Sequence, residues 1–126
     1  SKVVFEFEDI EKRLDCNFID NLSKKEKELS FKLILNAFND YSKKGGGFFE
    51  IINYKNKVGL DFIKEFIDLK EDIEVNDFND FAFVKGCDQM VLIIEGGKYN
   101  IEEIETINKY LSFSKEKVIG WFLIKD

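Results

Sequence analysis

Hydrophobic positions along the chain follow two different periods. Three runs are almost continuously apolar, as in strands of a parallel sheet that are covered on both faces: 48–53, 90–95 and 118–124. Three other segments carry apolar residues at three- and four-residue spacing, which predicts helices: 23–41, 58–69 and 100–111. This alternation predicts βαβ units. We therefore expect a reduced P-loop or Rossmann-like α/β fold of three layers, with a mostly parallel sheet between helices.

Local signals predict where the helices begin. Ser23–Glu26 and Asn100–Glu103 both fit the capping box, in which a side-chain oxygen and a Glu carboxylate satisfy free backbone N–H groups. In the first helix, Leu29 and Leu33 are expected on the buried face. Short helices are also expected within 8–15 and 80–85, an extended piece at 17–20, and no strand in the acidic stretch 72–80.

Composition narrows the possible functions. The 126 residues fit a single domain, 1–126, and no run of about 18 apolar residues spans a membrane. A net charge of −6 argues against nucleic-acid binding, and the absence of His removes His-dependent catalysis and metal binding. Cys16 and Cys87 lack metal-ligand spacing, so we expect two free, buried or half-buried thiols. A start at Ser1 favours a piece of a longer protein.

The segment from Asn53 to Asp61 has the strand–loop–helix order of a phosphate-binding loop. Gly59 could stand for the last glycine of a Walker A loop. However, Leu60 occupies the Lys position and Asp61 the hydroxyl position, and neither side chain can neutralise phosphate. We therefore expect no ATP binding, and we predict no catalytic, cofactor-binding or metal-binding residues.

A second loop, Gly96–Tyr99, follows the strongest predicted strand, where open α/β sheets usually bind ligands. The glycines at 45–47 precede a strand, so we interpret them as a flexible loop. The acidic residues of 68–80 match no metal-binding spacing. Six residues of the two loops after strands form a candidate interaction or vestigial site: Lys55, Lys57, Gly59, Gly97, Lys98 and Tyr99.

The stretch 77–126 resembles the end of the cytoplasmic ATPase-like domain of polysaccharide co-polymerases, a family of bacterial tyrosine autokinases and chain-length determinant proteins. The resemblance rests on a short acidic segment with Ala82 and Asp88, an apolar strand, a Glu-rich helix and the closing run Lys117–Leu123. In addition, 9–14 is similar to the segment that follows the second membrane helix of those proteins.

The resemblance implies a cytoplasmic domain of a membrane protein, at the cytoplasmic side of the inner or plasma membrane. Its partners would be a second copy, a cognate tyrosine kinase or a polysaccharide polymerase. Membrane contact would come only through a segment outside this chain. The lost Walker A loop, the absent Pro and the lack of an Asp-x-Asp strand end depart from the family, so kinase activity is not implied. The chain between 69 and 77 also looks too short for the family's intervening strand and helix.

We therefore predict a non-catalytic interaction or regulatory domain in surface polysaccharide biosynthesis or export. One alternative is a stand-alone small-ligand or nucleotide-binding domain. Another is a response-regulator-like signalling domain, which needs an acceptor Asp ending its third strand, a Lys ending its fifth and two acids after its first. Docking would require at least two exposed members of an aromatic set near the loops: Phe48, Phe49, Tyr54, Tyr99 and Trp121.

Overall fold

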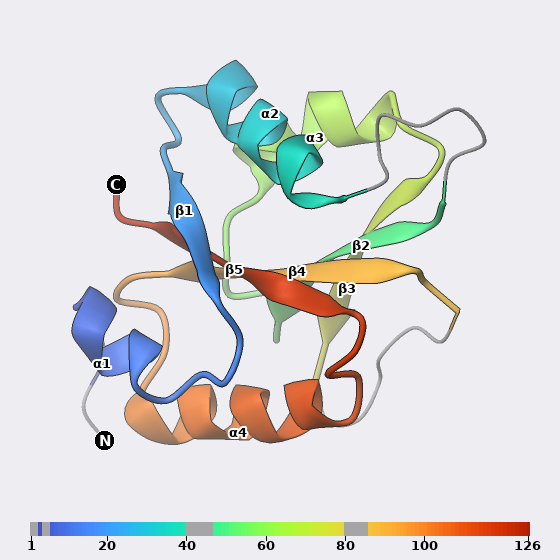
Figure 1. Cartoon of the computed structure of the whole chain (residues 1–126). Helices are drawn as coiled ribbons and strands as arrows, with labels where there is room; N and C mark the ends of the chain where they lie inside the picture. The colour runs from blue at the N-terminus through green and yellow to red at the C-terminus, as the bar shows by residue number, and fades with distance from the viewer. Residues whose placement is uncertain (1–2, 4–5, 40–46, 80–85) are drawn as a thin grey trace.

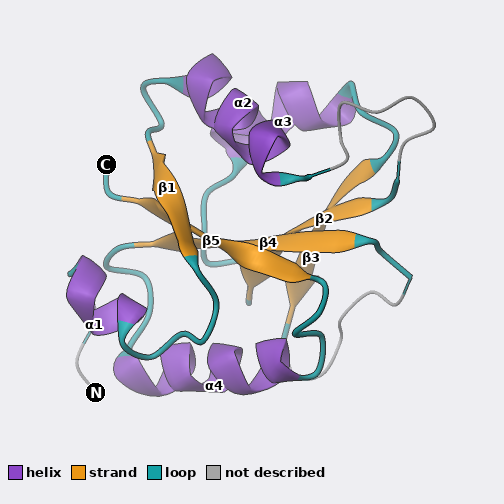
Figure 2. Ribbon diagram, in the orientation of Figure 1, coloured by secondary structure: helices purple, strands orange, loops and turns teal. Residues whose placement is uncertain are grey.

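The computed structural model of the chain describes residue 3 and residues 6–39, 47–79 and 86–126. The elements follow in the order α1 (Phe7–Glu11), β1 (Phe18–Leu22), α2 (Lys27–Ala37), β2 (Phe49–Tyr54), α3 (Asp61–Asp68), β3 (Ile73–Phe78), β4 (Gln89–Glu95), α4 (Ile101–Ser112) and β5 (Val118–Ile124). All strand pairs are parallel. Helices α2 and α3 cover one face of the sheet and α1 and α4 the other (Figures 1 and 2). The predicted α/β fold with three layers is confirmed.

The strand order is β1-β5-β4-β2-β3. Counted from β2 as the first strand, this is the flavodoxin-like order 2-1-3-4-5, with the N-terminal strand β1 in the fifth position. The chain leaves β2 through α3 on one face, and it leaves the neighbouring β4 through α4 on the other face (Figure 1). The carboxyl ends of β2 and β4 therefore form the topological switch point, where doubly wound sheets leave a crevice.

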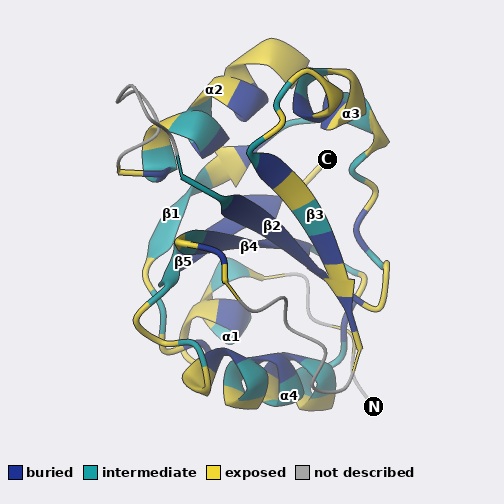
Figure 3. Cartoon of the chain, turned by 90° about the vertical axis from the view of Figure 1, so that its right-hand side faces the viewer, coloured by how far each residue is buried: buried dark blue, intermediate teal, exposed yellow. Residues whose placement is uncertain are grey.

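The core lies on both sides of the three central strands (Figure 3). Every residue of β2 is buried, as expected for a strand with a neighbour on each side and a helix layer on each face. On the α4 side, the Tyr54 ring lies 6.2 Å from that of Tyr110; on the α2 side, Phe49 lies 4.7 Å from Phe38. Because side chains alternate along a strand, Glu50 and Ile52 share the α4 side with Tyr54.

Gly120 allows the close approach of β1 to β5. A Cβ atom at this position would lie 2.3 Å from the Asn17 carbonyl oxygen, which accepts a hydrogen bond from the Trp121 backbone N–H. A side chain at residue 120 would therefore push the edge strand away from the sheet.

Several sequence-based expectations are confirmed. Segments 48–53, 90–95 and 118–124 form parallel strands, and the capping box at Asn100 and Glu103 is present. Cys16 is half-buried and Cys87 buried, and both thiols are free. Among the described residues, no helix is long and apolar enough to cross a bilayer. The helix expected within 80–85 lies outside those residues.

The start of α2 corrects the prediction for Ser23. The helix begins at Lys27, after a turn, because the Ser23 hydroxyl donates to Asp126 rather than capping a helix. The later start also rotates the buried face. Ser30, Phe31 and Ile34 are buried, whereas Leu29 is 54% exposed.

The acidic stretch 72–80 contains β3, which the sequence did not predict. This is an edge strand with an open side, so its exposed positions are polar, Glu74 and Asp77 among them. This mixture of apolar and polar positions does not give a recognisable strand pattern in the sequence, because a strand covered on both faces would be continuously apolar. The segment between 69 and 77 therefore contains most of one strand.

Candidate functional site

An open cleft of about 880 Å³ lies at the carboxyl edge of the sheet. It is bounded by the β2–α3 loop, by α3, by the exposed side of β3 and by the end of β4. Its position follows from the topology, because α3 and α4 leave adjacent strands in opposite directions. Charged side chains gather there from segments far apart in the sequence, among them Lys24, Asp77, Glu95 and Lys98.

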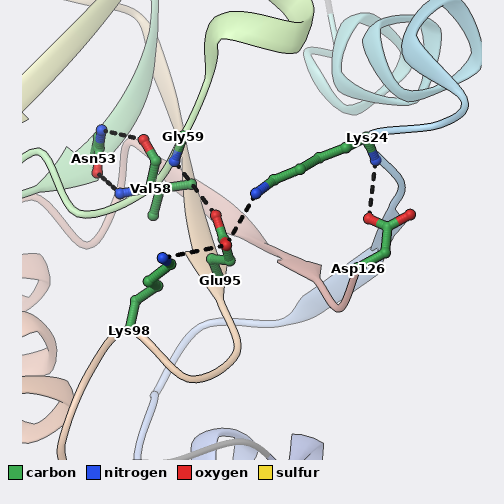
Figure 4. Close-up of polar contacts among 7 residues, drawn as sticks. All are labelled: Lys24, Asn53, Val58, Gly59, Glu95, Lys98 and Asp126. Atoms are coloured by element: carbon green, nitrogen blue, oxygen red, sulfur yellow. Dashed lines mark hydrogen bonds and ion pairs between the residues drawn. The ribbon is translucent and has the colours of Figure 1, made fainter.

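Glu95 is the centre of this charged group (Figure 4). It ends β4 and is only 7% exposed. Its Oε2 lies 3.0 Å from the Lys24 Nζ and 3.9 Å from the Lys98 Nζ. Its Oε1 accepts a hydrogen bond from the Gly59 backbone N–H at 3.3 Å. A buried carboxylate needs such partners, since an unpaired charge is costly to remove from water.

Lys24 reaches Glu95 from the far edge of the sheet. It follows β1, which is separated from β4 by β5. The backbone of this segment is fixed by Asp126, whose Oδ1 accepts from the Lys24 N–H at 2.9 Å and whose other oxygen accepts from Ser23 (Figure 4). These contacts lower the pKa of Asp126, the Ser23 hydrogen bond most strongly. The end of β1 is thus tied to the end of β5, with the Lys24 side chain directed over it toward β4.

The β2–α3 loop is shaped by its own backbone and by Asn53. The Asn53 amide donates to the Val58 carbonyl and accepts from the Val58 N–H, both at 3.1 Å. Lys55 and Asn56 have φ values of 55° and 53°, and the Lys57 N–H bonds to the Tyr54 carbonyl. Two successive positive φ values closed by this bond make a type I′ turn. The loop is therefore a turn held by a side-chain clamp and not an open phosphate-binding loop.

A second ion pair ties this loop to α4. The Lys57 ammonium pairs with Glu103, and its Nζ lies 5.5 Å from the centre of the Tyr99 ring. Burial opposes ionisation of Glu103, but the Lys57 and Asn100 hydrogen bonds outweigh it and lower its pKa. Tyr99 is buried, and its hydroxyl donates to the Tyr54 carbonyl. Burial raises the pKa of Tyr99 far above its ordinary value.

The six residues predicted for this site lie along the same edge of the sheet but make different contacts. Gly59 and Lys98 contact Glu95, whereas Lys57 contacts Glu103 and Tyr99. Lys55 is exposed beside the Tyr54 ring. Gly97 has a φ of 86° and permits the turn before α4. Tyr99 is packed inside and offers no surface to a partner.

Sequence analysis missed the residues that join the site together. Glu95 carried a usable signal, because it is a charged residue closing a continuously apolar strand. Asn53 was named only as a strand end. Lys24 carried no signal, because its place depends on β1 lying at the edge beside β5.

The condition for aromatic docking, at least two exposed members of the set, is not met. Phe49, Tyr54, Tyr99 and Trp121 are buried, and only Phe48 is partly exposed. These rings pack on both faces of the sheet, as the Tyr54–Tyr99 and Phe49–Phe38 contacts show. Aromatic residues in a Phe-rich chain of this size are needed for the core.

The cleft offers carboxylates and lysines but no metal site. Within the described ranges, no group of three or more Cys, Asp or Glu side chains could hold a metal ion. Asp77, near the end of β3, is exposed, but neighbouring groups partly exclude water from its carboxylate and so raise its pKa, with Asn53 acting in the opposite direction. The Gly59 N–H, in the loop two residues before α3, is occupied by the Glu95 carboxylate, which places a negative charge close to the start of that helix.

Comparison of the chain with protein-family models, with curated proteins and with solved structures finds no match.

Proposed function

We propose that the chain is a non-catalytic interaction and regulatory domain in which an internal anion occupies the binding position at the switch point. The observation that carries this proposal is Glu95. Its carboxylate accepts from Gly59 N–H and pairs with Lys24, and so occupies the position that a ligand phosphate takes in nucleotide-binding α/β domains. Asp61 adds a second negative charge at the first position of α3. Both features oppose the binding of a nucleotide.

We place this domain in a chain-length determinant-like protein of surface polysaccharide biosynthesis or export, at the cytoplasmic side of the membrane. The resemblance of 77–126 to polysaccharide co-polymerases supports this setting. The partner would be a second copy, a cognate tyrosine kinase or a polysaccharide polymerase. A domain without ATP chemistry contributes to such an assembly through its surface, and here that surface is not the aromatic set, of which four members are buried.

Calorimetric titration with Mg-ATP tests the non-catalytic part of this proposal. We expect no saturable heat up to millimolar nucleotide, because the β2–α3 loop has Leu60 at the position of the phosphate-neutralising Lys and its Gly59 N–H already binds Glu95. The Glu95→Gln variant is the matched comparison, since it removes the competing charge and retains the side-chain shape. Micromolar binding to the unaltered chain would contradict the proposal.

A receiver-like signalling domain is the second candidate, and the Lys24–Glu95 pair favours it. With β2 as first strand, β4 is the third and β1 the fifth. An acidic residue thus ends the third strand and a lysine follows the fifth, at 3.0 Å from each other. The acid is Glu and not Asp, and β2 is followed by Lys55 and Asn56 instead of two acids. We therefore propose a receiver-like arrangement without phosphotransfer.

Sedimentation equilibrium of the chain and of Glu95→Gln separates the two candidates. A fixed docking surface predicts self-association that is equal in both proteins. A receiver-like domain predicts that Glu95→Gln changes the association constant by at least about fivefold. That factor corresponds to the lower end of the coupling free energies found between two sites of one protein. Glu105→Gln, an exposed change of the same type on α4, is the control and should leave it unchanged. A chain that stays monomeric throughout would contradict self-association under both candidates.

A further inference from the structure

The other buried glutamate, Glu50, lies far from the cleft contacts and has none of their partners. It is the second residue of β2, between β3 and β4, and it is 0% exposed. Among the residues that the structure describes, neither carboxylate oxygen has a hydrogen-bond partner. Asn76 of β3 interacts with the carboxylate and lowers its pKa, but the effect of burial is larger. A carboxylate in this position is stable chiefly in its neutral form.

We propose that Glu50 is a proton-dependent switch, which is neutral in the tightly packed domain and loosens the α4 side of the sheet when it ionises. This inference goes beyond the proposed function and does not depend on it. It rests on the central position of Glu50, on its complete burial and on the absence of an ion pair or geometric hydrogen bond to it within the described part of the chain. An ionised Glu50 must gain water or a counter-charge, and either gain requires the covering layer to move.

The charged groups around Glu50 set the direction of the switch. The pKa of Glu50 is raised from 4.5 to about 6, chiefly by burial. Asn76 and Lys117 lower it, and Glu74, its register partner on β3, raises it. Cys87 and Asp88 directly precede β4, at the amino-terminal edge of the sheet near Glu50. The pKa of Cys87 is raised, chiefly by burial and also by the negative charge of Glu50. Lys117 is the cation placed to meet an ionised Glu50, because its carbonyl accepts from the N–H of Met90, which pairs with Glu50 in the sheet.

The sign of the pH dependence follows from this shift. A carboxyl with a raised pKa in the folded state contributes stability that is fully present below the unfolded value of 4.5 and is lost as pH rises through about 6. A difference of about 1.5 pH units corresponds to a roughly 30-fold change in the unfolding equilibrium constant. The loss should therefore be complete near pH 7.5.

The test compares the chain with Glu50→Gln, which retains the shape of the side chain and cannot ionise. The unfolding equilibrium constant is measured by urea unfolding at pH 4.5 and at pH 7.5. The ratio of the two constants should be roughly 30-fold larger in the unaltered chain than in the variant. Glu74→Gln is the matched control, an exposed carboxylate on the neighbouring strand, and it should retain most of that larger ratio. Equal pH profiles for the unaltered chain and Glu50→Gln would overturn the proposal.

A direct titration keeps the test independent of the variant's folding. Carboxyl ¹³C NMR of the unaltered chain should give Glu50 a midpoint near 6, and a midpoint at or below 4.5 would overturn the proposal. Lys117→Met should move the midpoint upward and Glu74→Gln should move it downward. Amide exchange of β2 and β4 should accelerate above the midpoint in the unaltered chain only. Unchanged exchange would refute the loosening of the α4 side.

Discussion

Glu95 and Glu50 are buried to a similar degree in neighbouring central strands, yet their surroundings are opposite. Glu95 has two lysines and a backbone N–H within reach, whereas neither oxygen of Glu50 has a hydrogen-bond partner in the ranges that the structure describes. The difference is positional. Glu95 closes its strand, where three connecting segments converge, and Glu50 lies inside its strand, where backbone groups are already used by the sheet.

The comparison shows what a buried charge does in each place. At the strand end, the carboxylate joins the β2–α3 loop, the end of β1 and the turn before α4 into one connected network. Inside the strand, a carboxylate joins nothing and responds to pH instead. Burying a charge is therefore tolerated for different reasons: through ion pairing at Glu95 and through protonation at Glu50.

The same substitution at the two positions should have opposite effects, and this is the largest difference that we expect. At pH 7.5, Glu95→Gln should lower the free energy of unfolding by about 2 kcal/mol, because it leaves Lys24 facing a neutral amide in a mostly buried site. Glu50→Gln should raise it by up to about 2 kcal/mol, because it removes an unpaired buried charge. Urea denaturation measures both. If both substitutions changed the free energy of unfolding in the same direction, the contrast between a paired Glu95 and an unpaired Glu50 would be wrong.

A smaller effect should rank the two lysines that contact Glu95. Lys24→Met should destabilise the chain by about 1 kcal/mol, because its Nζ lies 3.0 Å from Glu95 Oε2 and its side chain is partly buried. Lys98→Met should cost less than about 0.5 kcal/mol, because its Nζ is 3.9 Å away and its side chain is half exposed. Thermal unfolding at low and high salt measures the order. A larger loss for Lys98→Met would show that the Gly97–Lys98 turn, and not the end of β1, holds Glu95.

The sequence by itself determined the elements whose residues form a complete local pattern. The apolar runs of β2, β4 and β5 and the capping box at Asn100 are such patterns, because the burial of a central strand and the cap of a helix depend on nearby residues. From these elements the parallel α/β architecture followed. The loss of a phosphate-binding loop at Leu60 and Asp61 was likewise readable from residue types alone.

Only the tertiary structure decided the edges of the sheet and the composition of the site. Strand β3 has mixed polarity because one side of it is open, and the start of α2 moved because Ser23 bonds to Asp126, 103 residues later in the chain. Lys24 can pair with Glu95 only because β1 lies beside β5 in the sheet. Glu50 was visible in the sequence as a charge within an apolar run. Its lack of a partner emerged only from the packing of β3 and β4 around it, because a contact between distant segments depends on the register of the whole sheet.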